Sequence, residues 1–133
     1  ESFDVVVSFD VIEHIENDQK MVSEAYRVLK KGGQLLIGTP NRDRLIHALL
    51  RLIGRPVHYP LYIGHYENLG DMIHVREYSA SELEKILKTS GFVQREVLPF
   101  WFGITSLEYG LFHAPKILSG MSQYLFGRAR KQV

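Results

Sequence analysis

The chain has 133 residues, of which 45% are hydrophobic and 23% are charged, and its formal net charge is +1. These values are typical of one globular domain with a hydrophobic core, and the weak charge argues against nucleic-acid binding driven by bulk charge. The sequence contains no cysteine, which excludes disulfides and thiolate metal sites and makes a cytoplasmic location the expectation. No apolar run approaches the roughly 18 residues that a membrane-spanning helix needs.

The first predicted element is a strand over residues 3–9, which contains three consecutive valines. A β-branched run of this kind is typical of a strand buried on both faces. Asp10, Glu13 and His14 follow at spacings i, i+3 and i+4, so their side chains share one face if a helical turn begins there. Open α/β sheets bind their ligands at the carboxyl ends of their strands. These three residues are therefore the leading candidates for a functional site.

A helix and a second strand follow with short connections. The apolar spacing predicts an amphipathic helix over residues 18–30, and the run KKGG at residues 30–33 is expected to end it. Residues 34–39 are predicted to form the next strand, which Pro40 closes. Strand, helix and strand in this order predict a right-handed βαβ unit.

The middle of the chain, residues 42–75, is less regular. An apolar helix is predicted over residues 45–53, with Gly54 as its end, and residues 56–69 are predicted to be a loop because they show no period. An insertion of this length after a strand favours a lid or a substrate-binding element. Because the helix is also basic, contact with a membrane surface or a partner is the alternative.

Regular structure is predicted again at Ser79, which forms a capping box with Glu82 and begins a helix that ends at Ser90. The remaining predicted elements are a strand over residues 92–99, a loop with a short helix over residues 100–120, and a final strand over residues 123–130.

Three blocks in this order, FDVVVSFDVIEHI, RVLKKGGQLLIGTPN and HVREYSASELEKILKTSGF, resemble the second half of a class I S-adenosylmethionine-dependent methyltransferase. The similarity is to the type 11 methyltransferases and the ubiquinone-biosynthesis O-methyltransferases. It implies an α/β, Rossmann-like fold, here the C-terminal half of a mostly parallel sheet, with strands in the order 4-5-7-6 and the last one antiparallel. It also implies S-adenosylmethionine as cofactor and a small-molecule acceptor that is methylated on oxygen.

The resemblance assigns roles to the candidate site residues. In the similar ubiquinone O-methyltransferases and terminal-ribose RNA methyltransferases, a Glu-x-x-Glu-His motif binds a metal, and Asp10, Glu13 and His14 occupy its positions here. A divalent ion (Mg²⁺, Mn²⁺ or Zn²⁺) would bind the acceptor hydroxyl and lower its pKa. Without metal, His14 and Glu13 would act as catalytic acid/base groups or acceptor contacts. A purely structural role, such as helix capping, is the third alternative.

Two aromatic or imidazole residues complete the candidate list. The family resemblance gives Phe9 a contact with the adenosine end of the cofactor, and the alternative is a core aromatic at a strand end. His74 belongs to the third block and is expected to form a salt bridge, with a place at the mouth of the active site as the alternative.

The chain contains no G-x-G-x-x-G sequence, the Gly-rich loop that cradles such cofactors. We therefore expect residues 1–133 to be a single domain, the C-terminal part of a catalytic domain, that is inactive and binds S-adenosylmethionine poorly by itself. The rival hypothesis is a non-catalytic module that self-associates through the unpaired edge of its first strand.

Overall fold

A computed structural model describes the chain except for residues 69, 104–109 and 112–115. Part of the segment predicted as a loop with a short helix therefore lies outside the described residues. The elements, in chain order, are β1 (Phe3–Phe9), η1 (Ile12–His14), α1 (Asp18–Val28), β2 (Leu29–Pro40), α2 (Leu45–Leu52), β3 (Leu61–Tyr66), β4 (Gly70–His74), α3 (Ala80–Thr89), β5 (Val93–Phe100), β6 (Phe102–Gly103), β7 (Gly110–Leu111), η2 (Lys116–Met121) and β8 (Tyr124–Arg130).

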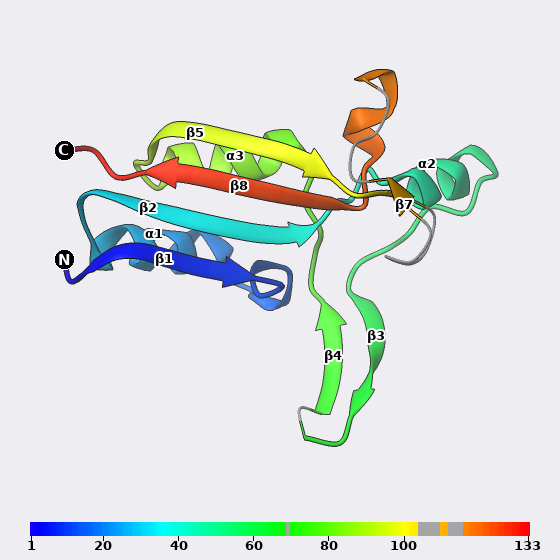
Figure 1. The fold of residues 1–133 in the computed structure, drawn as a ribbon. Coiled ribbons are helices and arrows are strands. Elements are labelled where there is room, and N and C mark those ends of the chain that lie inside the picture. The colour runs from blue at the N-terminus through cyan, green and yellow to red at the C-terminus, as the bar shows by residue number, and fades with distance from the viewer. Residues whose placement is uncertain (69, 104–109, 112–115) are drawn as a thin grey trace.

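The main sheet has the strand order β1-β2-β8-β5. Strands β1 and β2 are parallel, whereas β8 is antiparallel to both of its neighbours, β2 and β5. The α/β fold class and the final antiparallel strand are thereby confirmed, and the observed order of the four strands is the one that the resemblance implied for its strands 4, 5, 7 and 6. Helices α1 and α3 lie together on one face of this sheet, and both chain termini lie at one end of it (Figure 1).

The hydrophobic core fills the space between the two helices and the sheet. Alternate residues of each strand face it, as the two-residue period of a strand requires. Leu35 and Ile37 of β2 and Leu125 of β8 are buried there against Leu83 and Leu87 of α3. The predicted capping box is confirmed, since the Ser79 hydroxyl accepts from the Glu82 amide and the Glu82 carboxylate accepts from the Ser79 amide. This cap fixes where α3 begins on the core.

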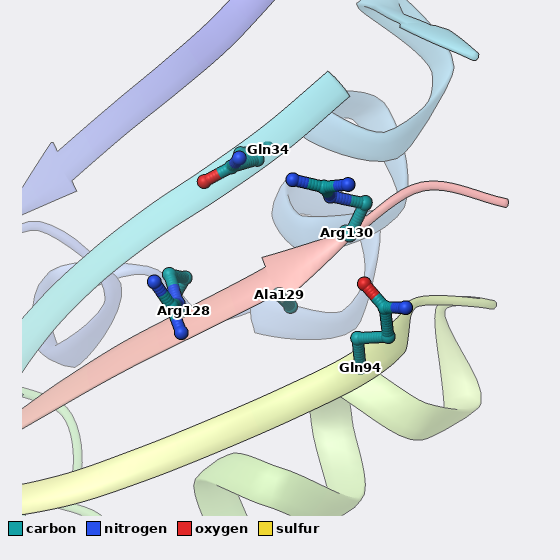
Figure 2. A pocket seen from close by; sticks show the side chains of 5 residues that line it. All are labelled: Gln34, Gln94, Arg128, Ala129 and Arg130. Carbon is teal, nitrogen blue, oxygen red and sulfur yellow. The ribbon is translucent and has the colours of Figure 1, made fainter. Parts of the chain in front are cut away.

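The opposite face of the sheet is bare in the described part of the chain. Phe3, Val5, Val7 and Phe9 of β1 are each about half exposed on it, so β1 is not buried on both faces here. Farther along the sheet, near the end that holds the termini, the same face has a shallow polar pocket (Figure 2). The pocket is lined by Gln34, Gln94, Arg128, Ala129 and Arg130.

Residues 56–69 are not all loop, which corrects the prediction. Strands β3 and β4 pair antiparallel, from Leu61 with His74 to Tyr66 with Gly70, and form a hairpin that extends away from the main sheet (Figure 1). Much of β3 is exposed to solvent, so its side chains carry no apolar–polar alternation, and the backbone pairing defines the hairpin. Together, α2 and the β3–β4 hairpin are called the arm below.

The end of the first helix also differs from the prediction. Helix α1 ends at Val28, and β2 already begins at Leu29, which pairs with Phe3. The next pair in the register joins Val5 to Gln34, so the KKGG run forms an irregular bulge in β2 rather than a helix end. Gly32 lies in this bulge with a φ of +74°, a conformation that glycine adopts without strain.

Among the described residues, no helix is long and apolar enough to cross a bilayer.

Candidate functional site

The candidate site lies where β1 and β2 end, beside the base of the arm. The chain leaves β1 at Asp10, which has a φ of +52°, and enters the three-residue turn η1 at Ile12. Aspartate tolerates this left-handed conformation better than most residues. Because Asp10 stands outside the turn, it does not share a helical face with Glu13 and His14, which corrects the sequence-based expectation.

The structure places Asp10 against the last strand instead. The Tyr124 hydroxyl of β8 donates a hydrogen bond to the Asp10 carboxylate. Burial and this bond to a carboxylate together raise the pKa of Tyr124. The phenol therefore stays protonated and fixes the turn that leads from β1 to the site.

Glu13 is fully buried in the turn. Its Oε2 accepts a hydrogen bond from the Thr39 hydroxyl at 2.9 Å, whereas no described residue donates to its Oε1. Burial raises the pKa of Glu13, and the Thr39 hydroxyl opposes that shift. A buried carboxylate oxygen without a partner is costly, which is a common mark of a ligand site.

His14 is fixed by the arm. Its Nδ1 lies 2.7 Å from the carbonyl oxygen of Ile73 on β4. Because a carbonyl can only accept, Nδ1 must carry the proton, and Nε2 of the neutral ring has a free lone pair. The segment that follows β4 contacts Glu13, whose carbonyl accepts from the Val75 amide at 2.8 Å.

His74, at the end of β4, completes the site. Its ring lies edge-on to that of His14, with 4.9 Å between the ring centroids. One ligand atom each from Glu13, His14 and His74 lies within 4.8 Å of the other two. The structure thus brings two of the three predicted residues together, and His74 joins them where Asp10 was expected.

The donor set of this cluster suits a divalent cation. It offers a carboxylate and two imidazoles, which are ligands of Zn²⁺ and Mn²⁺, and the carboxylate has an oxygen that the described residues leave unpaired. Both Nδ1 atoms are hydrogen-bonded, which leaves the Nε2 atoms as the ring nitrogens available to a ligand. These residues therefore fit a metal ion, and equally a polar substrate group.

Phe9 lies at the end of β1, on the bare face of the sheet. The residue is 45% exposed, and its ring stacks on that of Phe126, with centroids 6.0 Å apart and planes inclined by 25°. Gly38 of β2 makes room for it, since a Cβ atom at Gly38 would clash with the Phe9 ring. The exposed part of Phe9 is apolar aromatic surface, a kind of surface that planar ligands contact.

An apolar groove begins at Phe9 and runs between β1 and α1. It is lined mainly by valine, alanine, methionine and leucine side chains and contains few polar atoms. The shallow pocket of Figure 2 lies elsewhere, because Gln34 pairs with Val5 at the start of β1, whereas Phe9 pairs with Gly38 at its end. That pocket contains none of the candidate residues.

Sequence reasoning gave no site role to Thr39, which holds Glu13, and undervalued His74. Glu77, which holds His74, lies three residues after it in the third similar block. His74 was assigned mainly to a salt bridge, and it does pair with Glu77, but it also faces His14. Its place in the third similar block, just ahead of the capping box, was the signal that could have found it.

Comparison with known proteins gives a consistent set of relatives. A family profile described as a methyltransferase domain matches residues 1–97. A Mycolicibacterium smegmatis protein, named a probable S-adenosylmethionine-dependent methyltransferase, is 35% identical over 122 residues, which cover 92% of this chain and 41% of that protein. The mitochondrial ubiquinone biosynthesis O-methyltransferase of Rattus norvegicus is 43% identical over 49 residues, which cover 37% of this chain and 14% of that protein.

Solved structures share the fold. An S-adenosylmethionine-dependent methyltransferase of Thermotoga maritima, a possible histamine N-methyltransferase, has a TM-score of 0.69 at 23% identity, and the match covers 99% of this chain and 57% of that one. The phosphoethanolamine N-methyltransferase 2 of Haemonchus contortus, in complex with S-adenosyl-L-methionine, has a TM-score of 0.57 at 20% identity, and the match covers 98% of this chain and 34% of that one. The chain spans less than two thirds of the length of these relatives.

Proposed function

The chain belongs to the family of class I S-adenosylmethionine-dependent methyltransferases, and from that premise we propose that Glu13, His14 and His74 bind the methyl acceptor, a small molecule methylated on oxygen. The observation that carries this proposal is the cluster of Glu13, His14 and His74, in which one ligand atom from each residue lies within 4.8 Å of the other two. No described residue donates to Oε1 of Glu13, and both Nδ1 atoms are hydrogen-bonded elsewhere, so Oε1 and the Nε2 atoms are the acceptors proposed to meet the substrate. A hydroxyl group that enters this cluster finds acceptors for its proton.

His14 is the group proposed to take that proton. The acceptor oxygen attacks the methyl carbon of the sulfonium, the carbon–sulfur bond breaks, and the hydroxyl proton passes to Nε2 of His14. The sulfur leaves as a neutral thioether, so charge and atoms balance. Ordinary histidine is half protonated near pH 6.5, which makes it an effective base at neutral pH. Glu13 and His74 orient the hydroxyl group, and alignment of this kind supplies much of the rate.

A divalent ion is the alternative occupant of the same atoms. When bound there, it would lower the pKa of the acceptor hydroxyl as a Lewis acid. Glu13, His14 and His74 would hold it, with the Ile73 carbonyl and Glu77 fixing the two imidazoles from behind. Asp10 is not proposed as a ligand, because it lies outside the cluster and accepts from Tyr124.

Oxygen is favoured over nitrogen as the methylated atom on two grounds. The curated relatives include ubiquinone biosynthesis O-methyltransferases, although the Rattus norvegicus protein matches only 49 residues. In addition, a hydroxyl group keeps a lone pair for attack while it donates its proton to the cluster, whereas an aliphatic ammonium group has no lone pair until it loses a proton. The N-methyltransferases among the solved structures share the fold alone.

The cofactor is proposed to bind across Phe9, with its Gly-rich loop supplied by further sequence. Support comes from the lengths of the relatives, since the matches cover 41% of the Mycolicibacterium smegmatis protein and 14% of the Rattus norvegicus protein. The 133 residues also contain no G-x-G-x-x-G motif. The bare face of β1 and the groove beside α1 give additional elements apolar surfaces to cover. The arm is proposed to cover the acceptor as a lid that is held at its base, in a cytoplasmic enzyme.

The rival hypothesis assigns a different role to the exposed edge and bare face of β1. A non-catalytic module would cover the edge and bare face of β1 with a second copy of itself. Analytical ultracentrifugation of the 133-residue chain, with isothermal titration of S-adenosylmethionine, separates the two ideas. Binding that is weak or absent supports the proposal that the cofactor loop lies elsewhere, whereas tight binding to this chain alone contradicts it. A stable dimer without cofactor binding favours the rival.

The activity itself is tested with the product of the natural reading frame that encodes this chain. Labelled S-adenosylmethionine is offered with matched acceptors that differ only in the reacting atom, such as a phenol, an aniline and a thiol of the same ring. We expect transfer to the phenol. Transfer to the aniline alone would contradict O-methylation while leaving the family assignment intact.

A further inference from the structure

We propose that Glu77 is a positioning residue that fixes the orientation and the proton of His74 and fastens the arm to the site. Glu77 is buried in the loop between β4 and α3. Its side chain reaches the acceptor cluster through His74, so the proposal rests on the role proposed above for that histidine.

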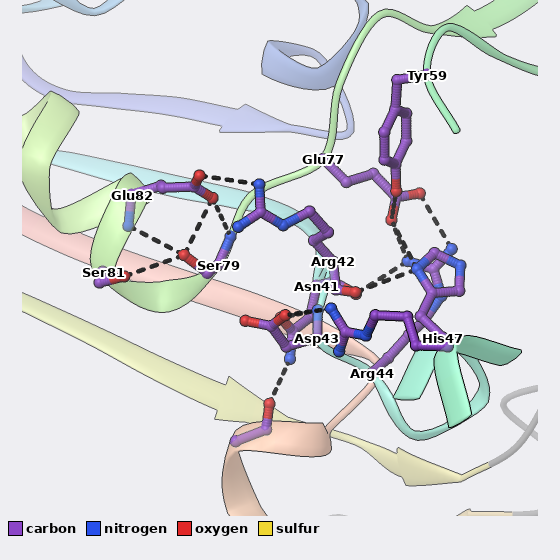
Figure 3. A network of polar contacts seen from close by, with 12 residues as sticks. Asn41, Arg42, Asp43, Arg44, His47, Tyr59, Glu77, Ser79, Ser81 and Glu82 are labelled. Atoms are coloured by element: carbon purple, nitrogen blue, oxygen red, sulfur yellow. Dashed lines mark hydrogen bonds and ion pairs between the residues drawn. The ribbon is translucent and has the colours of Figure 1, made fainter. Parts of the chain in front are cut away.

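Glu77 accepts hydrogen bonds from three side chains at once, Arg44, Tyr59 and His74. Figure 3 shows Arg44 and Tyr59 beside Glu77. The guanidinium of Arg44 donates to both carboxylate oxygens, with the Nη2 contact to Oε1 at 3.0 Å. The Tyr59 hydroxyl donates to Oε2 at 2.8 Å, and Nδ1 of His74 lies 2.9 Å from Oε1. Each carboxylate oxygen therefore accepts from two donors. The carboxylate group cannot rotate without breaking hydrogen bonds on both oxygens.

These contacts keep the carboxylate ionised in spite of its burial. Burial by itself would raise the pKa of Glu77, but the hydrogen bonds from His74 and Arg44 outweigh it and lower the pKa to about 2. Arg44 donates to both oxygens of Glu77, so the carboxylate is the acceptor among its neighbours and Nδ1 of His74 donates to Oε1. Its proton is thereby held on the side away from the acceptor, and Nε2 offers a lone pair to the site.

The same carboxylate joins separate parts of the arm. Arg44 precedes the first residue of α2, Tyr59 lies between α2 and β3, and His74 ends β4. His47 of α2 adds a fourth contact, with its Nδ1 3.8 Å from Glu77 Oε2. Since the end of β4 also holds His14 through Ile73, a shift of the arm would move both imidazoles of the site.

The hydrogen bond from His74 to Glu77 is not needed for a purely structural ion pair. Arg44 alone can neutralise Glu77 with its two-pronged contact, and buried pairs of this kind are common. The additional bond to His74 has a directional effect, because it selects one tautomer of a ring that faces His14. Carboxylates behind ligand histidines act in this way, and their loss typically costs roughly 10- to 100-fold in affinity or activity.

The test is the position of the His74 proton, measured by ¹H–¹⁵N NMR of the imidazole in wild type, Glu77→Met and Tyr59→Phe. Glu77→Met removes the acceptor but keeps an unbranched side chain, whereas Tyr59→Phe removes one donor to the same carboxylate and leaves the His74 bond in place. We expect the proton on Nδ1 in wild type and Tyr59→Phe, and a shift toward Nε2 in Glu77→Met. An unchanged tautomer in Glu77→Met, or an equal shift in Tyr59→Phe, would overturn the proposal.

A second, milder variant gives the same test if Glu77→Met does not fold. Glu77→Asp keeps the charge but withdraws the carboxylate by one methylene, so the His74 proton should still shift in part, and an unchanged tautomer again contradicts the inference. In the complete enzyme, Glu77→Asp should lower kcat/KM for the acceptor by roughly 10- to 100-fold and leave KM for S-adenosylmethionine near its wild-type value. If the proposed function fails, the tautomer shift is still observed, so the two failures are distinguishable.

Discussion

The Thr39 hydroxyl donates a 2.9 Å hydrogen bond to Oε2 of Glu13, and this contact links the end of β2 to the turn that follows β1. Both side chains are fully buried. The bond leaves Oε1 of Glu13 as the carboxylate oxygen to which no described residue donates. The ends of two adjacent parallel strands thus fix the position of one carboxylate group.

Thr39→Val removes this hydrogen bond while keeping the shape of the side chain. Because the hydroxyl favours the charged carboxylate and burial disfavours it, the pKa of Glu13 should rise further. The variant should unfold with a free energy lower by about 1 to 3 kcal/mol at neutral pH, the usual cost of leaving a buried acceptor unpaired. Urea denaturation measures this cost, and ¹³C NMR of the carboxyl group follows the pKa.

Thr89→Val is the matched control, because the Thr89 hydroxyl also donates hydrogen bonds, to Gln19 and within α3, but in the exposed last turn of the helix. It should change the unfolding free energy by no more than about 0.5 kcal/mol. If both variants lose the same unfolding free energy, the buried hydrogen bond from Thr39 contributes no more to stability than an exposed one.

Gly38→Ala tests the close packing beneath the proposed cofactor surface. A Cβ atom at Gly38 would clash with the Phe9 ring and lie 2.8 Å from the Tyr124 ring, so both aromatic side chains must move. We expect a loss of about 1 to 3 kcal/mol in stability, as for other overpacked sites. Gly120→Ala, where a Cβ atom meets nothing within 4 Å, should change stability little. Equal thermal unfolding of the two variants would contradict this packing.

The acid sensitivity of the fold should depend on Glu77. Its pKa of about 2 in the folded protein lies below the ordinary value of 4.5, so folding favours the charged form. The resulting stability, on the order of 3 kcal/mol, is fully present above about pH 4.5 and is lost as the pH falls toward about 2. In Glu77→Gln the unfolding free energy should therefore change less steeply than in wild type between about pH 5 and pH 2. Parallel curves would show that the Glu77 carboxylate is not specially stabilised.

The regular parts of the fold were predictable because their signals are local. The valine run of β1, the apolar spacing of α1 and the capping box at Ser79 each determine their element through neighbouring residues. The strand order followed from the family resemblance rather than from any one pattern. The β3–β4 hairpin was missed because exposed strands leave no apolar alternation to read.

The site was only half predictable for a related reason. Glu13 and His14 are adjacent in sequence, so their pairing could be seen directly. His74 lies far along the chain from His14, and it reaches the site only because β4 ends beside η1. Asp10 failed as a partner because the backbone turns left-handed at that residue, whereas the i, i+3, i+4 spacing assumes a continuous helical turn.

The most direct measurement is kcat/KM for a hydroxyl acceptor in the complete enzyme with His14→Ala, compared with His65→Ala. His65 is an exposed histidine of the same arm, paired with Asp71 on the hairpin, and it lies outside the acceptor cluster. We predict a loss of at least about 100-fold in His14→Ala, with KM for S-adenosylmethionine unchanged, and wild-type kinetics in His65→Ala. Wild-type kcat/KM in His14→Ala would contradict the proposal that this cluster binds and deprotonates the acceptor.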